Sequence, residues 1–284
     1  MLQGPIWSGT LYHLVSHADD MIKEFIKFNS ADSYDEHASV MTTFAYSQAR
    51  GMPAISNLLA YTKEVTGAPA PFEGFLAVPS MFNATSVTNM TGISKATGAL
   101  NPSGARCVLQ ASLTVCDETN RGQNRSINLT ATLVSNESVI KAAYERWNAS
   151  YPAVKDVPNI LYCLVLEPLP PILYQRHAKA NALGLVGRTD ALVVALLSVS
   201  WTNASDDALV YSTSNALLED IKTAAKELGG LDPYIFMNYA GQEQDVIGSY
   251  GAENVRRLKQ VRQDVDPRGI FTHQVPGGYK IPDK

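Results

Sequence analysis

Two histidines have a spacing that could bind a metal ion. In His13-x-x-x-His17 the i,i+4 spacing would place both imidazoles on one face of a helix, where a third ligand could complete a site. The sequence lacks the His-Glu-x-x-His pattern that adds a general base to such a pair. We therefore interpret both as surface or interface histidines and predict no metal site.

Hydrolytic and nucleotide chemistry find little support in the sequence. His37, His177 and His273 are isolated, and no Gly-x-Ser-x-Gly turn would expose a nucleophilic serine. No Gly-x-Gly-x-x-Gly or P-loop pattern is present, so nothing in the chain predicts a nucleotide-phosphate site by itself. Three acids beside apolar segments could line a substrate pocket, although helix caps and salt bridges are their simplest roles: Glu73, Glu167 and Asp190.

The carboxy-terminal segment carries linked motifs in a fixed order. They are Tyr234-Ile-Phe-Met-Asn-Tyr-Ala240, Ser249-Tyr-Gly-x-Glu-Asn-Val-x-Arg-Leu-Lys-x-Val261, Asp266-Pro-x-Gly-Ile-Phe271 and Pro276-Gly-Gly-Tyr-Lys280. Together they resemble the closing signature of berberine-bridge-enzyme-like flavoproteins, within the vanillyl-alcohol-oxidase/PCMH-type superfamily. The opening Gly4-Pro-Ile-Trp-Ser-Gly9 more weakly resembles the junction between the FAD-binding and substrate domains of that family. The stretch between matches in order and length only.

The resemblance implies an FAD-dependent oxidoreductase of the oxidase type. Its substrate would be a hydroxylated small molecule such as a sugar or a secondary metabolite, with molecular oxygen as the electron acceptor. This chain would supply the substrate-binding half, and the missing FAD-binding domain or another chain would lie along an exposed apolar seam. Two alternatives stay open, a flavin-free substrate-binding module and an inactive truncated fragment.

The resemblance also assigns candidate site residues. Asn238 and Tyr239 would contact the flavin or the substrate, and a Tyr239 whose pKa is lowered beside the ring could take the hydroxyl proton as a general base. The Asn238 amide can both donate and accept hydrogen bonds. Phe236 replaces the first tyrosine of the family's Tyr-x-Asn-Tyr motif and lacks its hydroxyl. Both candidates could instead be packing residues of a strand. Three others are expected to hold the closing helix: Tyr250, Asn254 and Arg257.

These residues need elements that position them. Hydrophobic periodicity predicts helices at 17–28 (capped by Ser16), after a cap at Asn136, after a cap at Asn203 and at 252–264 with Val255, Leu258 and Val261 inward. Strands are predicted at 39–48, 54–62, 106–116, 129–134, 159–167, 191–201 and 234–240, the first two forming a hairpin. A phenylalanine-rich patch, Phe72 to Phe82, is expected to pack over the sheet.

We infer an α+β fold in which helices cover one face of a largely antiparallel sheet. Residues 1–230 would form the substrate-binding domain, and residues 231–284 would pack against the FAD-binding domain and complete it. At 284 residues and 45% hydrophobic, the chain can bury a sizeable core.

Composition narrows the partners and the compartment. The formal net charge of -4 argues against nucleic acid, and no apolar run is long enough to span a bilayer. Seven Asn-x-Ser/Thr sequons predict a secreted glycoprotein for the parent protein, although they could be unused and the chain itself begins without a signal peptide. Three cysteines fit buried free thiols, or a hairpin stapled by one pair: Cys107, Cys116 and Cys163.

Overall fold

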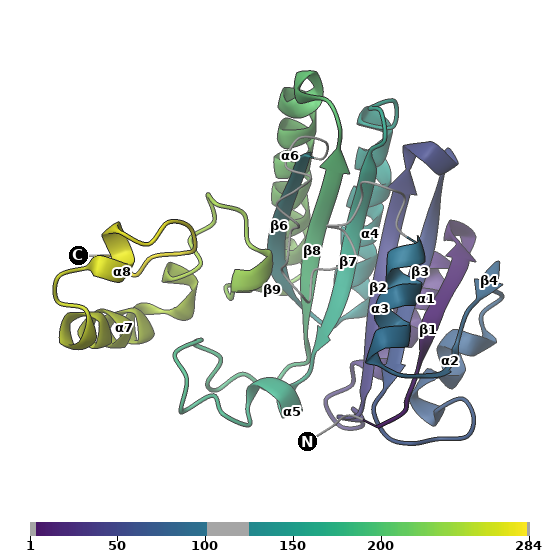
Figure 1. Cartoon of the computed structure of the whole chain (residues 1–284), viewed down its shortest axis with the longest axis horizontal. Coiled ribbons are helices and arrows are strands. Elements are labelled where there is room, and N and C mark those ends of the chain that lie inside the picture. The colour runs from purple at the N-terminus through teal and green to yellow at the C-terminus, as the bar shows by residue number, and fades with distance from the viewer. Residues whose placement is uncertain (1–3, 101–124, 283–284) are drawn as a thin grey trace.

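The chain folds around one broad sheet. A computed structural model describes residues 4–100 and 125–282, and for residues 96–100 it describes the backbone alone. In these residues the sheet has nine strands in the order β4-β1-β3-β2-β7-β8-β6-β9, with β5 also paired to β1 (Figure 1). The strands are β1 (Ile6–Leu14), β2 (Ala38–Ser47), β3 (Met52–Tyr61), β4 (Phe82–Asn83), β5 (Ser86–Thr88), β6 (Arg125–Val134), β7 (Leu161–Leu169), β8 (Leu192–Trp201) and β9 (Leu231–Asp232).

Every strand pair in the described residues is antiparallel, which confirms the predicted fold class. The β2–β3 hairpin forms as predicted, and Gly51 turns it with a positive φ of 68°. All ten residues of β8 are buried, as the unbroken apolar run predicted for a central strand. The predicted strand at 106–116 lies outside the described residues.

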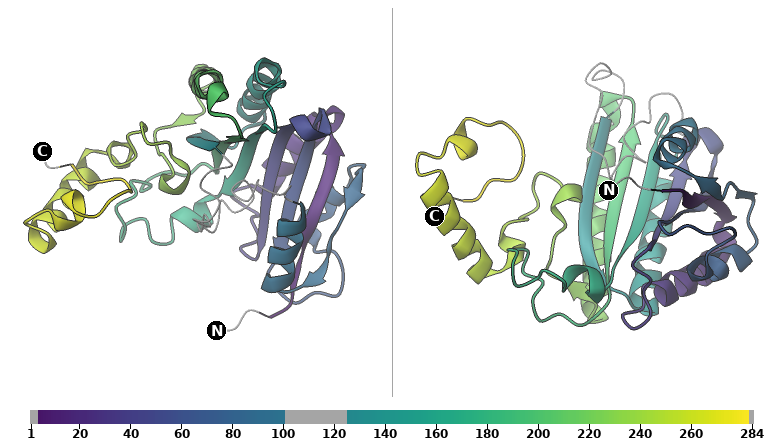
Figure 2. Two further views of the ribbon diagram at one scale, coloured as in Figure 1. Left: turned by 45° about the horizontal axis from the view of Figure 1, so that its top comes forward. Right: turned by 60° about the horizontal axis from the view of Figure 1, so that its bottom comes forward.

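The helices are α1 (Ala18–Phe28), α2 (Glu73–Ala77), α3 (Met90–Leu100), α4 (Glu137–Ser150), α5 (Pro171–Tyr174), α6 (Asp207–Glu227), α7 (Ala252–Val265) and α8 (Ile270–His273). Figures 1 and 2 show α4 and α6 side by side on one face of the sheet, and α1 lies on the same face. The main core fills the space between these helices and the sheet, with Trp147 and Phe44 both fully buried. Phe72 and Phe75 join this core as predicted, whereas Phe82 is half exposed.

Some predicted details of the elements are wrong. Ser16 does not cap α1, because it lies in the short 3-10 helix Val15–His17, and the helix begins after His17 without a side-chain cap. Val261 of α7 is exposed, whereas Val255 and Leu258, also predicted to face inward, pack partly buried against an apolar cluster.

The predicted strand at 234–240 is also wrong. Pro233 has no backbone N–H, and the N–H groups of Tyr234 and Ile235 bond to the side chains of Asp232 and Ser249. Because side chains satisfy these donors, no strand ladder forms. The segment then leads into a short 3-10 helix, η7 (Met237–Tyr239).

Replacing Asn136 with alanine should destabilise the fold by about 1 kcal/mol, because its side chain accepts the Ser138 N–H at the start of α4. Asn203 was predicted to cap in the same way, but its side chain makes no cap bond. Asn203→Ala is therefore the matched control and should change stability far less. Urea unfolding of protein from a bacterial host, which adds no glycan, measures both; equal losses would contradict the capping role.

Candidate active site

The two predicted site residues lie on the η7 turn, on the face of the sheet opposite α1, α4 and α6. Tyr239 is buried, and its ring packs with side chains of β7 and β8. Asn238, the preceding residue, is exposed. One residue of the pair is therefore accessible to a ligand, while the other extends into the protein.

The Tyr239 hydroxyl donates a hydrogen bond of 2.7 Å to Oε1 of Glu167. Glu167 belongs to β7, where successive side chains alternate between faces. Leu164 and Leu166 face the helical core, whereas Cys163 and Val165 belong to the apolar cluster around Tyr239. The same alternation places the Glu167 carboxyl on the Tyr239 side of the sheet.

Burial determines the protonation of this pair. It raises the pKa of Tyr239, and the neighbouring Glu167 charge raises it further. In this chain without flavin the Tyr239 pKa is therefore raised, and its lowering beside a flavin ring stays a prediction. Burial also raises the pKa of Glu167, although the hydrogen bond from Tyr239 opposes this. The phenol therefore stays protonated and donates to Glu167, and the carboxylate is the group of the pair that can accept a proton.

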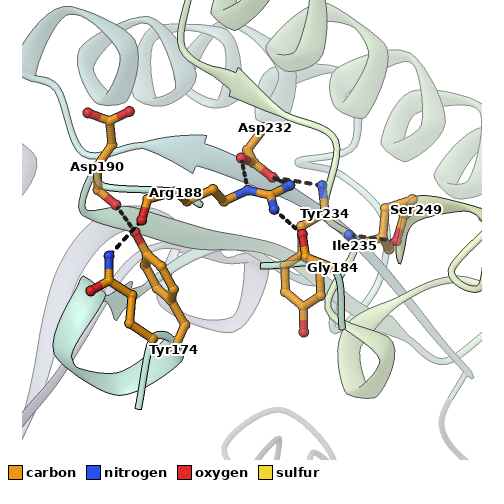
Figure 3. Close-up of polar contacts among 9 residues, drawn as sticks. Tyr174, Gly184, Arg188, Asp190, Asp232, Tyr234, Ile235 and Ser249 are labelled. Carbon is orange, nitrogen blue, oxygen red and sulfur yellow. Dashed lines mark hydrogen bonds and ion pairs between the residues drawn. The ribbon is translucent and has the colours of Figure 1, made fainter. Parts of the chain in front are cut away.

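A network of side-chain bonds holds the segment that leads to η7 (Figure 3). Arg188 forms a bidentate ion pair with Asp232, with nitrogen–oxygen distances of 2.6 and 2.9 Å. Asp232 also accepts the backbone N–H of Tyr234, and Ser249 accepts that of Ile235. Side chains from other segments therefore hold the backbone of residues 234 and 235 in place before η7.

Gln244 holds the other end of the turn. Its Oε1 accepts the N–H of Thr130 at 2.9 Å and that of Gly241 at 3.0 Å, and its Nε2 donates to the Thr130 carbonyl at 2.7 Å. The amide thus pairs with the edge of β6 as a strand residue would. Tyr279 adds a hydrogen bond to the Gly241 carbonyl.

Sequence reasoning missed Gln244, Arg188 and Asp232. Glu167 was among the candidate acids, but its pairing with Tyr239 was not foreseen. A polar residue at the end of an otherwise apolar strand was its available signal. The other two candidate acids, Glu73 and Asp190, are exposed, and the backbone carbonyl of Asp190 accepts the Tyr174 hydroxyl.

The interpretation of the two histidines as surface residues holds for the partly exposed His17 and is wrong for His13. His13 is fully buried on β1, while His17 lies in the following 3-10 helix and pairs with Asp20. Their side chains therefore do not share a helix face. In the part of the chain that the structure describes, no cluster of His, Cys, Asp or Glu could hold a metal ion, and no helix is long and apolar enough to cross a membrane.

The closing helix is anchored as the motifs predicted. Tyr250 is buried and stacks on Tyr234, Asn254 bonds to the Tyr250 carbonyl, and Arg257 donates to the carbonyls of residues 180 and 181. Asp266, the first residue of the third closing motif, accepts the N–H groups of Ile270 and Phe271 at the start of α8. Cys163 is a buried free thiol, as predicted; Cys107 and Cys116 lie outside the described residues.

Comparison with known proteins finds relatives named as an oligopeptidase and as FAD-dependent monooxygenases. No protein-family model matches the chain. It is 59% identical to the Oligopeptidase PhomG' of Diaporthe leptostromiformis over 283 residues, which are 99% of this chain and 22% of that protein. It is 30% identical to the FAD-dependent monooxygenase sdcF of Emericella nidulans, covering 98% of this chain and 55% of that protein.

Solved structures decide the fold. A 6-hydroxy-D-nicotine oxidase from Arthrobacter nicotinovorans superposes with a TM-score of 0.66 at 13% identity, over 100% of this chain and 56% of that one. The chain has the fold of the berberine-bridge-enzyme-like flavoproteins. A variant of berberine bridge enzyme itself superposes with a TM-score of 0.59 at 13% identity, over 95% of this chain and 54% of that enzyme.

The family resemblance drawn from the closing motifs is thereby confirmed at the level of the fold. The chain spans about half the length of the monooxygenase sdcF and of the two solved enzymes, and a smaller part of the oligopeptidase. The relatives named FAD-dependent monooxygenases agree with the flavin that the resemblance implied.

Substituting Glu167 by glutamine should stabilise the chain at pH 7 to 8. The raised pKa of the folded carboxyl means that its stabilising contribution is present below the unfolded value of about 4.3 and is lost as pH rises through the folded pKa. The neutral amide avoids that loss and still accepts the Tyr239 hydroxyl. Melting temperatures should differ at pH 8 and converge near pH 4.

Glu243→Gln is the control, because Glu243 is an exposed acid in the segment that follows η7. It should leave the melting temperature unchanged at both pH values. A Glu167→Gln protein that is less stable than wild type at pH 8 would show that the carboxylate is needed in the fold.

Proposed function

We propose that this chain is the substrate-binding half of an FAD-dependent oxidoreductase and that Glu167 and Tyr239 accept the substrate's proton. The observation that carries the proposal is the Tyr239–Glu167 hydrogen bond beside the exposed Asn238, on a fold shared with flavin oxidases. A carboxylate with a raised pKa that contacts a phenol is a suitable proton acceptor near neutral pH.

The residues present fit one edge of a flavin ring. Asn238 offers a donor and an acceptor to the polar ring edge, and the partly exposed Met237 beside it offers apolar contact. The sequence has no glycine-rich phosphate loop, so the dinucleotide half of FAD would be held outside this chain. Asn238 is therefore assigned to the ring, and no residue of the chain to the pyrophosphate.

Bound FAD would accept a hydride from the substrate carbon that carries the hydroxyl group. The hydroxyl proton passes to the Tyr239 oxygen while Tyr239 gives its own proton to the Glu167 carboxylate. This transfer needs no tyrosinate, which is why a raised Tyr239 pKa is compatible with the role. The substrate leaves as a carbonyl compound, and the proton stays on Glu167 until it exchanges with solvent.

The surroundings of the pair offer both apolar and hydroxyl contacts to a substrate. Met41, Ala45, Leu161 and Phe236 are partly buried against the apolar cluster around Tyr239. The strand register places the hydroxyl side chains of Thr43 and Ser198 on the same face, opposite Val165 and Cys163. We therefore propose a hydroxylated small molecule, a sugar or a secondary metabolite, as the substrate, with molecular oxygen as the electron acceptor.

The segment 231–284 is proposed to meet the FAD-binding part of the protein. Its described surface exposes four large apolar side chains on and around α7 and α8: Val261, Val265, Phe271 and Val275. Apolar groups gathered in this way usually mark an interface. The chain spans about half the length of most relatives, so a flavin-holding domain is the natural occupant.

A second reading is a flavin-free binding module or an inactive fragment. The oligopeptidase name belongs to a protein of which this chain covers 22%, and that share does not locate the peptidase activity in the matched part. No Gly-x-Ser-x-Gly turn is present to supply a nucleophile. An acid–phenol pair beside an exposed amide suits proton transfer better than ligand binding alone.

We also propose that the parent protein is secreted and glycosylated. Six sequon asparagines lie in the described residues, and every one of them is exposed to a glycosylating enzyme: Asn83, Asn89, Asn128, Asn136, Asn148 and Asn203. Asn124 lies outside the described residues.

Tyr239→Phe in the full-length flavoprotein should slow flavin reduction by about 10²- to 10⁴-fold, the usual contribution of a positioned acid–base group. Substrate affinity should hardly change, because the phenylalanine ring keeps the packing on β7 and β8. Stopped-flow absorbance of the flavin measures the rate directly. Undiminished reduction by Tyr239→Phe would remove the residue from the mechanism.

The 284-residue chain alone should not retain FAD through gel filtration, since the phosphate-binding part would lie elsewhere. The full-length protein, run as the control, should elute yellow with about one flavin per chain. A flavin-free full-length protein would support the binding-module reading, and a yellow 284-residue chain would contradict the division of the cofactor site.

A further inference from the structure

We propose that Arg188 is a positioning residue that holds Tyr239 against Glu167. The inference rests on the proposed function, because the role of Tyr239 is assigned there. It concerns a residue outside all the closing motifs, in the loop between β7 and β8.

Arg188 and Asp232 lie on the two chain segments that also carry Glu167 and Tyr239. The loop 170–191 continues directly from β7, the strand of Glu167, and Arg188 lies near its end. Asp232 lies on β9, shortly before the η7 turn of Tyr239. The Arg188–Asp232 ion pair and the Tyr239–Glu167 hydrogen bond therefore join the same two segments at two separate points.

The geometry of the ion pair suits a fixed link. Its side chains are 20% and 11% exposed, the least of the ion pairs in the described residues. Two guanidinium nitrogens contact the two oxygens of Asp232, and a third donates to the Gly184 carbonyl. Bidentate, charge-assisted contacts fix orientation as well as distance, and a lysine could not reproduce them.

A continuous set of contacts connects this link to Tyr239. The Asp232 oxygen that meets Arg188 also accepts the Tyr234 N–H, and the Tyr234 ring stacks on Tyr250 with 6.0 Å between centroids. Phe236 then packs edge-on against Tyr239 at 5.0 Å. Loss of Arg188 would leave the Asp232 charge partly buried without its partner, and the segment would shift to hydrate it.

Ionisation of the Tyr239 phenol reports its position without any flavin. In its present contact with Glu167 and with its ring buried, the phenol should titrate well above the ordinary value of about 10. A chain labelled with ¹³C at tyrosine Cζ would give this titration by NMR, and the spectrum of Tyr239→Phe would assign the signal.

Arg188→Ala should lower the Tyr239 titration midpoint toward the ordinary value of about 10, so that Tyr239 ionises at a pH at which the chain is still folded, whereas wild-type Tyr239 stays protonated there. Arg188→Lys should give a smaller shift, since it keeps the charge but not the bidentate contact. Arg176→Ala is the matched control, because Arg176 lies in the same loop and pairs with Glu36 at the surface. It should leave the Tyr239 midpoint where it is.

Tyr162 serves as an internal control that distinguishes a local shift of Tyr239 from a general loosening of the fold. It is buried on the helical face of β7, where its hydroxyl bonds with Ser150. The inference expects the Tyr239 signal to move while the Tyr162 signal stays. A folded Arg188→Ala chain with an unchanged Tyr239 midpoint, or with both tyrosines shifted equally, would overturn it.

Should Arg188→Ala fail to fold, Arg188→Lys and Asp232→Asn give the same test in milder form. Asp232→Asn retains an oxygen for the Tyr234 N–H but loses the charge, so it should shift Tyr239 in the same direction. A negative result would remove the role of Arg188 only, because flavin retention by the full-length protein is measured separately.

Discussion

Alternation of side chains along β7 and β8 is the constraint on which the rest of the structure depends. Both strands are buried on both faces, so each supplies one row of apolar side chains to the helical core and another to the opposite face. A shift of one residue in register would exchange the two rows and bury Glu167 among the helices. The antiparallel pairing of β7 with β2 and β8 on its two sides fixes that register. The position of the carboxyl is therefore a consequence of packing across the whole sheet.

The turn that carries Tyr239 has no such ladder, and it depends on side chains for its position. The loop 170–191 and the segment 231–250 share a second small core, in which Tyr174, Leu185 and Tyr250 are buried. Gly184 lies so close to the Tyr250 carbonyl that a Cβ atom there would stand 2.2 Å from the oxygen. Such close packing leaves few ways for the turn to move independently of the loop. Rigid strands thus position the acid, and a tightly packed irregular segment positions the phenol.

The sequence predicted the regular elements well because their apolar patterns report burial directly. The uninterrupted run of β8, the hairpin at Gly51 and the Asn136 cap each follow from local chemistry. The segment after Asp232 was predicted wrongly, since its aromatic residues are typical of a strand. Pro233 and the side-chain acceptors of the next two N–H groups prevent the hydrogen bonds that a strand would make with a neighbour. The contact between Glu167 and Tyr239 could not be predicted either. It joins residues far apart in the chain, and its existence depends on which sheet face the turn meets.

The state of the acid–phenol pair depends on what covers it. Glu167 is only partly buried in this chain, and burial already raises its pKa. A flavin ring laid against Asn238 would exclude more water from the same face, and desolvation penalises the ionised carboxylate. Its pKa would then rise further, toward the range in which a proton acceptor is half protonated at neutral pH and most effective. Tyr239 would remain protonated, because desolvation and the neighbouring Glu167 charge favour the neutral phenol. The Glu167 pKa would thus reach this range only when the flavin-holding part of the protein covers the site.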